Sequence, residues 1–423
     1  MAKPGSGNRV YYGWILVLTL AITETTSWGI LSYAFTVFLD PMQHELGWSK
    51  AELTGAYSLS LLVAAVAGLA VGRWLDRHGP RLLMTLGSVL ATLLVLAWSG
   101  VHDLLLFYLI WLGIGFTLAA VLYEPAFAVV ATWFVRRRAR ALTLLTFVAG
   151  FASVIYVPLA DWLVRTQGWR QALVTMAIIL AVGTIPLHAL LLRRRPEDLG
   201  LQPDGVVLPG PGGDAATSFK GRGSEEKSIP AKIALRGSAF WWMTLAFFLN
   251  TVALGGLSVH LIPFLTDHGY DGSFAASMLG LVGIMALPGR LVFTILGEKL
   301  PRSLLAACLF SLQTISLVVL LLTYSSTAGV IAFVIIFGIG FGAITPARAA
   351  LVADFYGRRH YATINSVLAL FATAARAVGP FTVGLAFDTI GNYQPAFWTL
   401  AGISALAVIS IVIAENKRPS SQK

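Results

Sequence analysis

Twelve apolar stretches, each long enough to cross a lipid bilayer as a helix, constrain this chain more than any other feature. One helical crossing takes about 20 apolar residues. The stretches run near residues 12–39, 51–72, 82–100, 104–134, 141–164, 170–192, 239–266, 273–297, 303–323, 327–353, 362–388 and 394–414. Of the 423 residues 57% are hydrophobic and only 12% are charged, a composition outside the range of soluble domains. The chain is therefore predicted to be an all-α membrane protein with twelve transmembrane helices.

The formal net charge of +10 comes from basic residues that gather in every second connection, not in one nucleic-acid-binding patch. These connections carry Arg73, Arg77, Arg81, Arg136, Arg137, Arg138, Arg140, Arg193, Arg194, Arg195, Arg302, Arg358 and Arg359. Lysine and arginine accumulate in the cytoplasmic loops of membrane proteins. We therefore expect both termini to be cytoplasmic, the lipid bilayer to surround the chain, and no nucleic-acid partner.

Residues 193–237 form a polar segment, rich in glycine and proline, that is typical of a flexible cytoplasmic linker. Its last part, residues 229–240, is predicted either as a short helix at the membrane surface or as plain linker. We expect the linker to separate a bundle of six crossings at residues 1–192 from a second bundle of six crossings at residues 238–423.

The two halves of the chain repeat one another weakly. Pro125 and Phe134 of the first half correspond to Pro346 and Phe355 of the second half at one constant offset. Six crossings followed by six, in parallel repeat, predict two bundles with a substrate site between them near the membrane midplane.

A single arginine, Arg376, interrupts the apolar stretch at residues 361–388. A guanidinium group keeps its proton, so a position facing lipid would be costly. Pro380 has no N–H to give to the carbonyl of Arg376. A fixed cation beside an unpaired carbonyl predicts that Arg376 faces a wet cavity and binds substrate there. The alternative is a buried ion pair with Glu24 or Glu124.

Glu24 and Glu124 are candidates for carrying a coupling proton. Glu24 lies about 18 Å along the first stretch, counted from Tyr12, which is central in a hydrocarbon core of about 30 Å. A carboxyl group at that depth is easily neutralised because burial penalises its charged form. The alternative for Glu24 is a neutral structural hydrogen bond. Glu124 lies nearer the cytoplasmic end, which favours a structural ion pair with an arginine of a neighbouring helix.

Arg290, Asn250 and Tyr33 are further candidates for binding substrate. Arg290 lies about 10 Å inside the cytoplasmic boundary of its helix, where it could instead extend to that boundary or brace the following connection. Asn250 and Tyr33 can donate hydrogen bonds to a carboxylate, and for each the alternative is a packing residue with satisfied hydrogen bonds. Arg348 is expected in a gate or at the lipid boundary.

The connection between the second and third stretches contains the sequence Gly72-Arg73-Trp74-Leu75-Asp76-Arg77-His78-Gly79-Pro80-Arg81. Asp76 can accept hydrogen bonds from helix N-termini and arginines, while Gly72 and Gly79 allow close helix approach and tight turns. The motif resembles the loop signature of the major facilitator superfamily, and the resemblance extends over the whole chain. It implies that Gly72, Asp76, Arg77, Gly79 and Arg81 latch the two bundles without contacting substrate.

A narrower resemblance rests on three short motifs, namely Tyr12-Gly13-Trp14, Gly47-Trp48-Ser49-Lys50-Ala51 and Arg194-Arg195-Pro196-Glu197-Asp198-Leu199-Gly200-Leu201. They look like bacterial members of the monocarboxylate porter and oxalate:formate antiporter branch, which implies small carboxylates as substrates. Monocarboxylate porters carry a lysine in the first helix and an aspartate–arginine pair in the eighth, and this chain lacks that lysine and that aspartate. The oxalate exchanger's single cations in helices eight and eleven are matched by Arg290 and Arg376.

These features together predict a secondary active transporter of small organic anions, with monocarboxylates as the expected class and protons as the candidate coupling ion. It would be a monomer in the inner (plasma) membrane of a bacterium and work by alternating access. One alternative is an exporter of drug-like amphipathic compounds, whose substrates would contact the acids Glu24 and Glu124. Another is a receptor on a transporter scaffold that binds a solute without moving it. The sequence has one cysteine, Cys308, and no HExxH, GxSxG or Walker motif, so we expect no enzyme activity, cofactor or metal site.

Overall fold

The computed structural model describes residues 11–205, 228–297 and 300–418, and it assigns no strand to any of them. The first half of the chain forms helices α1 to α8 and three short turns. Their bounds are α1 (Tyr12–Trp28), the π-helical turn η1 (Gly29–Tyr33), α2 (Phe35–Leu46), α3 (Lys50–His78), α4 (Pro80–Ser99), α5 (Leu104–Val121), α6 (Tyr123–Trp133), α7 (Arg138–Ala149), α8 (Ala152–Leu191), η2 (Pro196–Leu199) and η3 (Pro203–Gly205).

The second half begins with a short helix and continues with six long ones. Their bounds are α10 (Ala231–Arg236), α11 (Ser238–Asp267), α12 (Gly272–Gly297), α13 (Arg302–Thr323), α14 (Thr327–Tyr356), α15 (Tyr361–Ile390) and α16 (Gln394–Asn416). The short helix expected near residues 229–240 is therefore confirmed as α10. Residues 206–227 of the predicted linker lie outside the described residues.

Twelve crossings are present although only eleven helical stretches of the described chain are long and apolar enough to span a membrane. One of these stretches, residues 138–191, is 54 residues long, far more than the ~20 residues that one crossing takes. Within it Gly168 has the non-helical angles φ 78° and ψ 159°, which glycine adopts without strain. This break separates two crossings, and the predicted all-α class with twelve transmembrane helices is confirmed.

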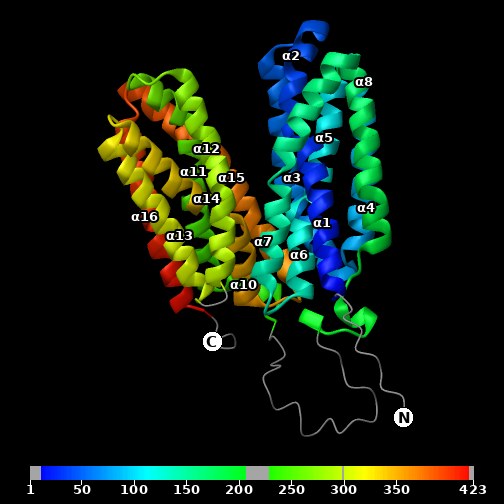
Figure 1. Ribbon diagram of the computed structural model, residues 1–423. Helices are drawn as coiled ribbons and strands as arrows, with labels where there is room; N and C mark the ends of the chain where they lie inside the picture. Colours follow the sequence, from blue (N-terminus) through cyan, green and yellow to red (C-terminus); the bar gives the residue numbers. More distant parts are fainter. Residues whose placement is uncertain (1–10, 206–227, 298–299, 419–423) are drawn as a thin grey trace, which may run out of the picture.

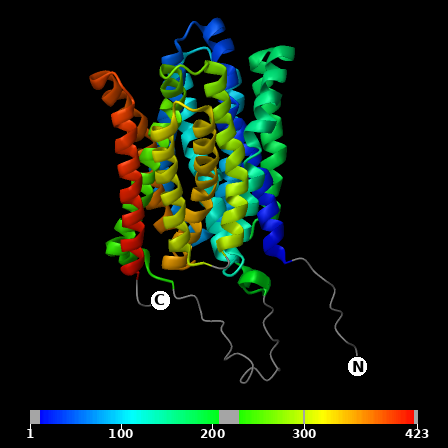
Figure 2. The ribbon, with the colours of Figure 1, turned by 60° about the vertical axis from the view of Figure 1, so that its left-hand side comes forward.

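The helices pack as two bundles (Figure 1). Helices α1 to α8 pack mainly on one another, and so do α11 to α16. Helices α3, α6 and α7 of the first bundle contact α12, α14 and α15 of the second. Figure 2 shows the long helices of both bundles lying roughly along one common axis, as expected for a protein that crosses a bilayer several times.

The bundles are joined towards one end of the molecule, which we call the basic end. It is the end where α1 begins, α16 ends and the arginine-rich connections lie (Figure 1). Hydrogen bonds between the bundles are made there by Asp76, Glu124, Thr132, Thr146 and Glu197 of the first half. Towards the opposite, far end the two bundles diverge in Figure 1.

Glycines bring helices of the second bundle into backbone contact. A Cβ atom on Gly342 of α14 would lie 1.9 Å from the carbonyl oxygen of Ala286 on α12. A Cβ atom on Gly379 of α15 would lie 2.3 Å from the carbonyl oxygen of Val252 on α11. Only a residue without a side chain fits at such separations. This packing fixes α15, which carries Arg376, against α11.

Candidate functional site

Arg376 lies near the middle of α15 with an exposed side chain. Its guanidinium group makes no hydrogen bond or ion pair with the rest of the described chain. Its charge lies close enough to interact electrostatically with Tyr33, Tyr57 and Glu124 of the first bundle and with Arg348 of the second. An exposed cation with neighbours from both bundles is therefore directed towards the region between them. The carbonyl of Arg376 instead faces α11, where a Cβ atom on Gly255 would lie 3.3 Å from its oxygen.

Tyr33 reaches the same region because the first crossing changes helix type. The turn Gly29–Tyr33 is π-helical, with the N–H of Ala34 donating to the carbonyl of Gly29 at 2.8 Å. Such turns hold one extra residue and occur frequently at functional sites. The side chain of Tyr33 is 42% exposed and lies within electrostatic range of Arg290 and Arg376. The structure thus brings the predicted residues Tyr33 and Arg376 together.

Arg290 of α12 connects the two bundles. Its guanidinium group donates to the carbonyl of Thr146 on α7, and its Nε donates to the carbonyl of Gly342 on α14 at 3.3 Å. The backbone carbonyl of Arg290 in turn accepts from the hydroxyl of Thr143 at 3.4 Å. The side chain therefore points across to the first bundle, not towards the lipid boundary. In this conformation Arg290 is a bridge, whereas Arg376 is a cation without a partner in the described chain.

Glu24 is completely buried in α1, with 0% of its surface exposed. Neither carboxyl oxygen makes a hydrogen bond of regular geometry in the described part of the chain, and the indole N–H of Trp28, on the same helix, is a donor close to it. Glu124 and Tyr123 lie within electrostatic range of Glu24. Burial of a carboxyl group favours its neutral form. The expected alternative, a structural hydrogen bond to a neighbouring helix, stays a prediction.

Glu124 forms an ion pair across the bundles. Its Oε1 lies 2.5 Å from Nη2 of Arg348 on α14, and its other oxygen accepts a hydrogen bond from the side-chain amide of Asn365 on α15. The helix break at Leu122, which has extended backbone angles, places Glu124 in the first turn of α6. The ion pair expected for Glu124 is thus present. Arg348 is only 9% exposed, which fits a gate and excludes the lipid boundary that was its other expected place.

Asn250, predicted as a hydrogen-bond donor to substrate, is fully buried inside the second bundle. Neither atom of its side-chain amide has a hydrogen-bond partner among the described residues. It therefore offers no surface to a ligand in this conformation. Its alternative as a packing residue with satisfied hydrogen bonds is not observed either.

Asp76 and Gly72 of the loop motif contact the second bundle at the basic end. The carboxylate of Asp76 accepts from the backbone N–H groups of Ala362 and Thr363 at 3.1 and 2.9 Å and from the hydroxyl of Thr363 at 2.5 Å. These groups belong to the first turn of α15, where a negative charge is stabilised by the helix dipole. A Cβ atom on Gly72 would lie 2.6 Å from the carbonyl oxygen of Ala362, so α3 and α15 touch.

The remaining motif residues contact the first bundle instead. Arg81 donates to the carbonyl of Ala189 at 2.6 Å, and the carbonyl of Arg77 accepts from the guanidinium group of Arg194. Gly79 has the left-handed angle φ 82° and packs on Arg194. Because α4 begins directly after this turn, these three residues fasten the connection to the end of α8. The expectation that all five motif residues join the two bundles therefore fits the geometry of Gly72 and Asp76 only.

Two residues of the site were missed by reasoning from the sequence. Tyr57 of α3 hydrogen-bonds Ser32 at 2.8 Å and lies within electrostatic range of Arg376. Asn365 of α15 shares Glu124 with Arg348. Both are polar residues in apolar stretches, and that signal alone could have marked them. A role can be assigned to either residue only when it is known which helices face each other.

Two helical bundles that enclose charged groups between them, in a chain of twelve membrane crossings, define a membrane transporter. A family model of the Major Facilitator Superfamily matches residues 17–380 and 307–423. The chain therefore belongs to the major facilitator superfamily, a family of transporters and not of enzymes.

Similar proteins are found among curated transporters and solved structures. Monocarboxylate transporter 13 of Bos taurus is 27% identical over 419 residues, covering 97% of this chain and 90% of that protein. The uncharacterised MFS-type transporter YcxA of Bacillus subtilis is 23% identical over 368 residues, covering 85% of each. The crystal structure of the transporter FucP in its outward conformation superposes with a TM-score of 0.71 at 15% identity, covering 96% of this chain and 99% of that one. This last similarity concerns the fold alone.

Proposed function

We propose that this protein is a secondary active transporter of small organic anions, with monocarboxylates as its substrate class. The observation that carries this proposal is Arg376, an exposed cation near mid-depth that has neighbours from both bundles and no hydrogen bond or ion pair in the described chain. An unpaired guanidinium group in a membrane protein is costly unless an anion or water meets it. A carboxylate can accept two parallel hydrogen bonds from its planar fork.

The surroundings of Arg376 suit a small carboxylate. Tyr33 and Tyr57 lie within its electrostatic range, and their phenol groups can donate to a carboxylate oxygen. Several relatives that match nearly the whole chain are monocarboxylate transporters, which supports the same substrate class. The site would bind the carboxylate through Arg376 and hold the rest of the molecule against the aromatic rings.

Alternating access follows from where the bundles are joined. The ion pair of Glu124 with Arg348 and the hydrogen bonds of Asp76 all lie nearer the basic end. Opening that end requires these bonds to break, while the far end closes. An anion on Arg376 would neutralise its charge and let the two bundles close around it, so that substrate biases the equilibrium between the two forms.

Proton coupling through Glu24 extends the proposal. Complete burial of the Glu24 carboxyl group favours its neutral form, so we propose that Glu24 holds the coupling proton in this conformation. If the opposite conformation exposes Glu24 to water or to Arg290, the group would release that proton. The cycle would then move a proton together with the anion.

The basic end is proposed to face the cytoplasm of a bacterial cell. Arginine-rich connections favour the cytoplasmic side, and the relative from Bacillus subtilis supports a bacterial plasma membrane. In this orientation the two bundles are joined at the cytoplasmic end and diverge towards the outside of the cell (Figure 1), and both termini are cytoplasmic.

The test is uptake of radiolabelled formate, acetate, lactate, pyruvate and oxalate into proteoliposomes, with and without an inward proton gradient. We expect at least one of these acids to accumulate, and R376Q to abolish its uptake. The matched control is R165Q, because Arg165 is 77% exposed and its ion pair in the described chain is with Asp161, one turn away. Competition by amphipathic cations without carboxylate uptake would favour the exporter, and binding without flux would favour the receptor.

A further inference from the structure

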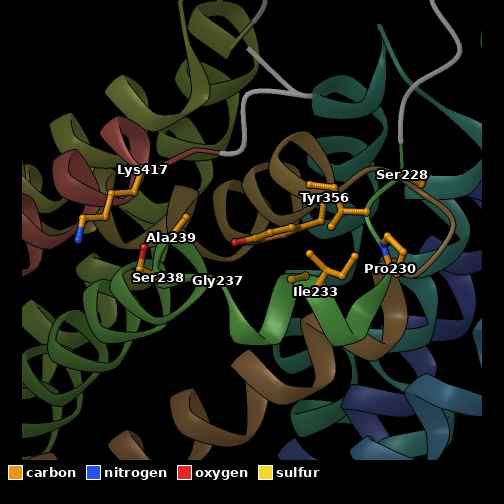
Figure 3. A pocket seen from close by; sticks show the side chains of 10 residues that line it. Ser228, Pro230, Ile233, Gly237, Ser238, Ala239, Tyr356 and Lys417 are labelled. Atoms are coloured by element: carbon orange, nitrogen blue, oxygen red, sulfur yellow. The ribbon is translucent and has the colours of Figure 1, made fainter.

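The basic end of the second bundle contains a pocket of about 440 Å³ that the transport site does not use. It is enclosed by α10, the start of α11, and the ends of α14 and α16. Figure 3 shows the ring of Tyr356 lying along the pocket, with α10 on one side and Lys417 near its edge. An adjoining hollow of about 400 Å³ shares Ser238 with this pocket. We call the two together the α10 pocket.

The α10 pocket carries two cations that have no acidic partner in the described chain. Lys417 lines the first part, and Arg236 lines the second. Neither side chain has an acidic partner or a hydrogen bond in the described chain, and none of the described residues that line the pocket is acidic. The ammonium group of Lys417 lies 5.9 Å from the centre of the Trp242 ring, which keeps it beside the pocket. The charge of this surface is therefore complementary to an anion.

A buried hydroxyl group points into the same place. Tyr356 is only 1% exposed, and its phenol oxygen has no hydrogen-bond partner among the described residues. In Figure 3 the ring extends from the end of α14 towards Ser238 and Ala239. A buried hydroxyl without a partner is unfavourable, and an anionic oxygen beside Ser238 would satisfy it once the ring of Tyr356 turns towards the pocket.

The rim of the pocket is apolar and exposed. Ile233 is 62% exposed, Trp241 is 46% exposed and Leu245 is 39% exposed. Tryptophan is enriched where a membrane meets water, since its ring is apolar and its N–H is polar. A free inorganic anion would gain nothing from these side chains, whereas an acyl chain would cover them.

We propose that the α10 pocket binds an anionic phospholipid from the leaflet at the basic end. The phosphate lies between Lys417, Ser238 and Arg236, and the acyl chains run along Trp241 and Leu245. Basic residues near the membrane surface attract anionic lipids, and here they stand beside an apolar surface that a soluble anion does not need.

A bound lipid would stabilise the conformation in which the basic end is closed. The segment before α10 is joined to the end of α14 by the N–H of Ile229, which donates to the carbonyl of Tyr356 at 3.0 Å. The next connection carries Arg358, which crosses to Glu197 of the first half at 2.7 Å. A lipid bound against Tyr356 therefore restrains the end of α14 and the connection that follows it, and this connection reaches across to the first bundle through Arg358.

The test uses the full-length protein, delipidated in detergent, with phosphatidylglycerol, phosphatidylcholine or inorganic phosphate added. Native mass spectrometry measures bound lipid, and thermal unfolding measures stabilisation. We expect phosphatidylglycerol alone to bind and raise the melting temperature, and the K417Q/R236Q double variant to bind it about tenfold more weakly. The control K232Q removes an exposed charge of α10 that does not line the pocket and should bind as the unchanged protein does.

Three results would overturn the proposal. The first is that phosphatidylcholine binds as well as phosphatidylglycerol, and the second is that K417Q/R236Q binds phosphatidylglycerol as the unchanged protein does. The third is that inorganic phosphate stabilises the protein as much as the lipid does, which would assign the pocket to a soluble phosphate compound. If the double variant is misfolded in lipid-free detergent, Y356F decides, because it removes only the buried hydroxyl group. It should weaken phosphatidylglycerol binding by about threefold or more, the loss of one hydrogen bond, and unchanged binding would contradict the proposal.

Discussion

Glu124 of α6 and Arg348 of α14 form an ion pair that joins the two bundles, with oxygen and nitrogen 2.5 Å apart. The side chains are 28% and 11% exposed, so solvent screens the pair only partly. Asn365 adds a third group from α15. A transporter that opens at its basic end has to separate these residues, and the pair therefore sets part of the energy difference between its two conformations.

Replacing Glu124 by glutamine should favour the conformation that is open at the basic end. The variant leaves Arg348 without a counter-charge, which we estimate to cost about 1–3 kcal/mol, or a shift of roughly 5- to 150-fold in the conformational equilibrium. Spin labels at Arg136 and Leu300 in a C308S background would report it as an increased distance across the basic end. The control E45Q removes an exposed acid at the far end, and an unchanged distance in E124Q would refute the role of the pair.

The D76N variant should also favour the conformation that is open at the basic end. It removes the negative charge that faces the first turn of α15, a contribution of roughly 0.3–2 kcal/mol. The E124Q/D76N double variant should open the basic end further than either single variant, since the substitutions at Asp76 of α3 and Glu124 of α6 each remove a different contact between the bundles. Cysteine accessibility at the basic end provides the measurement. Equal accessibility in D76N and the unchanged protein would show that Asp76 does not latch the bundles.

R376K tests how substrate is held. Lysine keeps the positive charge but loses the planar fork, so a carboxylate would lose one of its two parallel hydrogen bonds. We expect KM for the best carboxylate to rise about tenfold, corresponding to about 1.4 kcal/mol, with a smaller change in maximal rate. If R376K transports with unchanged KM, a direct guanidinium–carboxylate contact is wrong.

E24Q should separate proton coupling from substrate exchange. Glutamine has the shape of the protonated acid and cannot release a proton. Accumulation driven by an inward proton gradient should therefore be lost, while exchange of internal for external substrate continues at a comparable rate. Proteoliposome counterflow measures the exchange, and E52Q, at an exposed position, is the control. Retained gradient-driven accumulation in E24Q would remove Glu24 from the coupling mechanism.

G342A should destabilise the second bundle. Its new Cβ atom would lie 1.9 Å from the carbonyl oxygen of Ala286, and such overpacking costs about 1–3 kcal/mol. The matched control is G283A on α12, where a Cβ atom meets no atom within 4 Å. Thermal unfolding of the purified variants should show a lower melting temperature for G342A only. Equal melting temperatures would mean that α12 and α14 can separate easily.

The sequence was sufficient for the crossings, because the length and hydrophobicity of each stretch are local properties. It was also sufficient to single out Arg376, since a charge in an apolar helix stands out by itself. Residues whose role depends on a partner far away in the chain could not be predicted in the same way. Glu124 and Asn365 are 241 positions apart, and only the packing of α6 against α15 brings them together.

A local feature was missed as well. Nothing in the composition of Gly29–Tyr33 signals a π-helical turn, because the stretch reads as continuous apolar helix. The turn begins where the first crossing packs most tightly on α8: a Cβ atom on Gly29 would lie 2.2 Å from the ring of Tyr156. Such packing between helices is not visible in the sequence.

The π-helical turn also sets the helical phase of all residues that follow it in the first crossing. It contains one residue more than an α-helical turn, and each residue of an α-helix rotates the chain by about 100°. Deleting one residue between Gly29 and Tyr33 would restore a regular helix and rotate α2 by that angle relative to α1. A different side chain would then face Arg376. A single-residue deletion is thus a short evolutionary route by which this scaffold could change the group that it presents to its substrate.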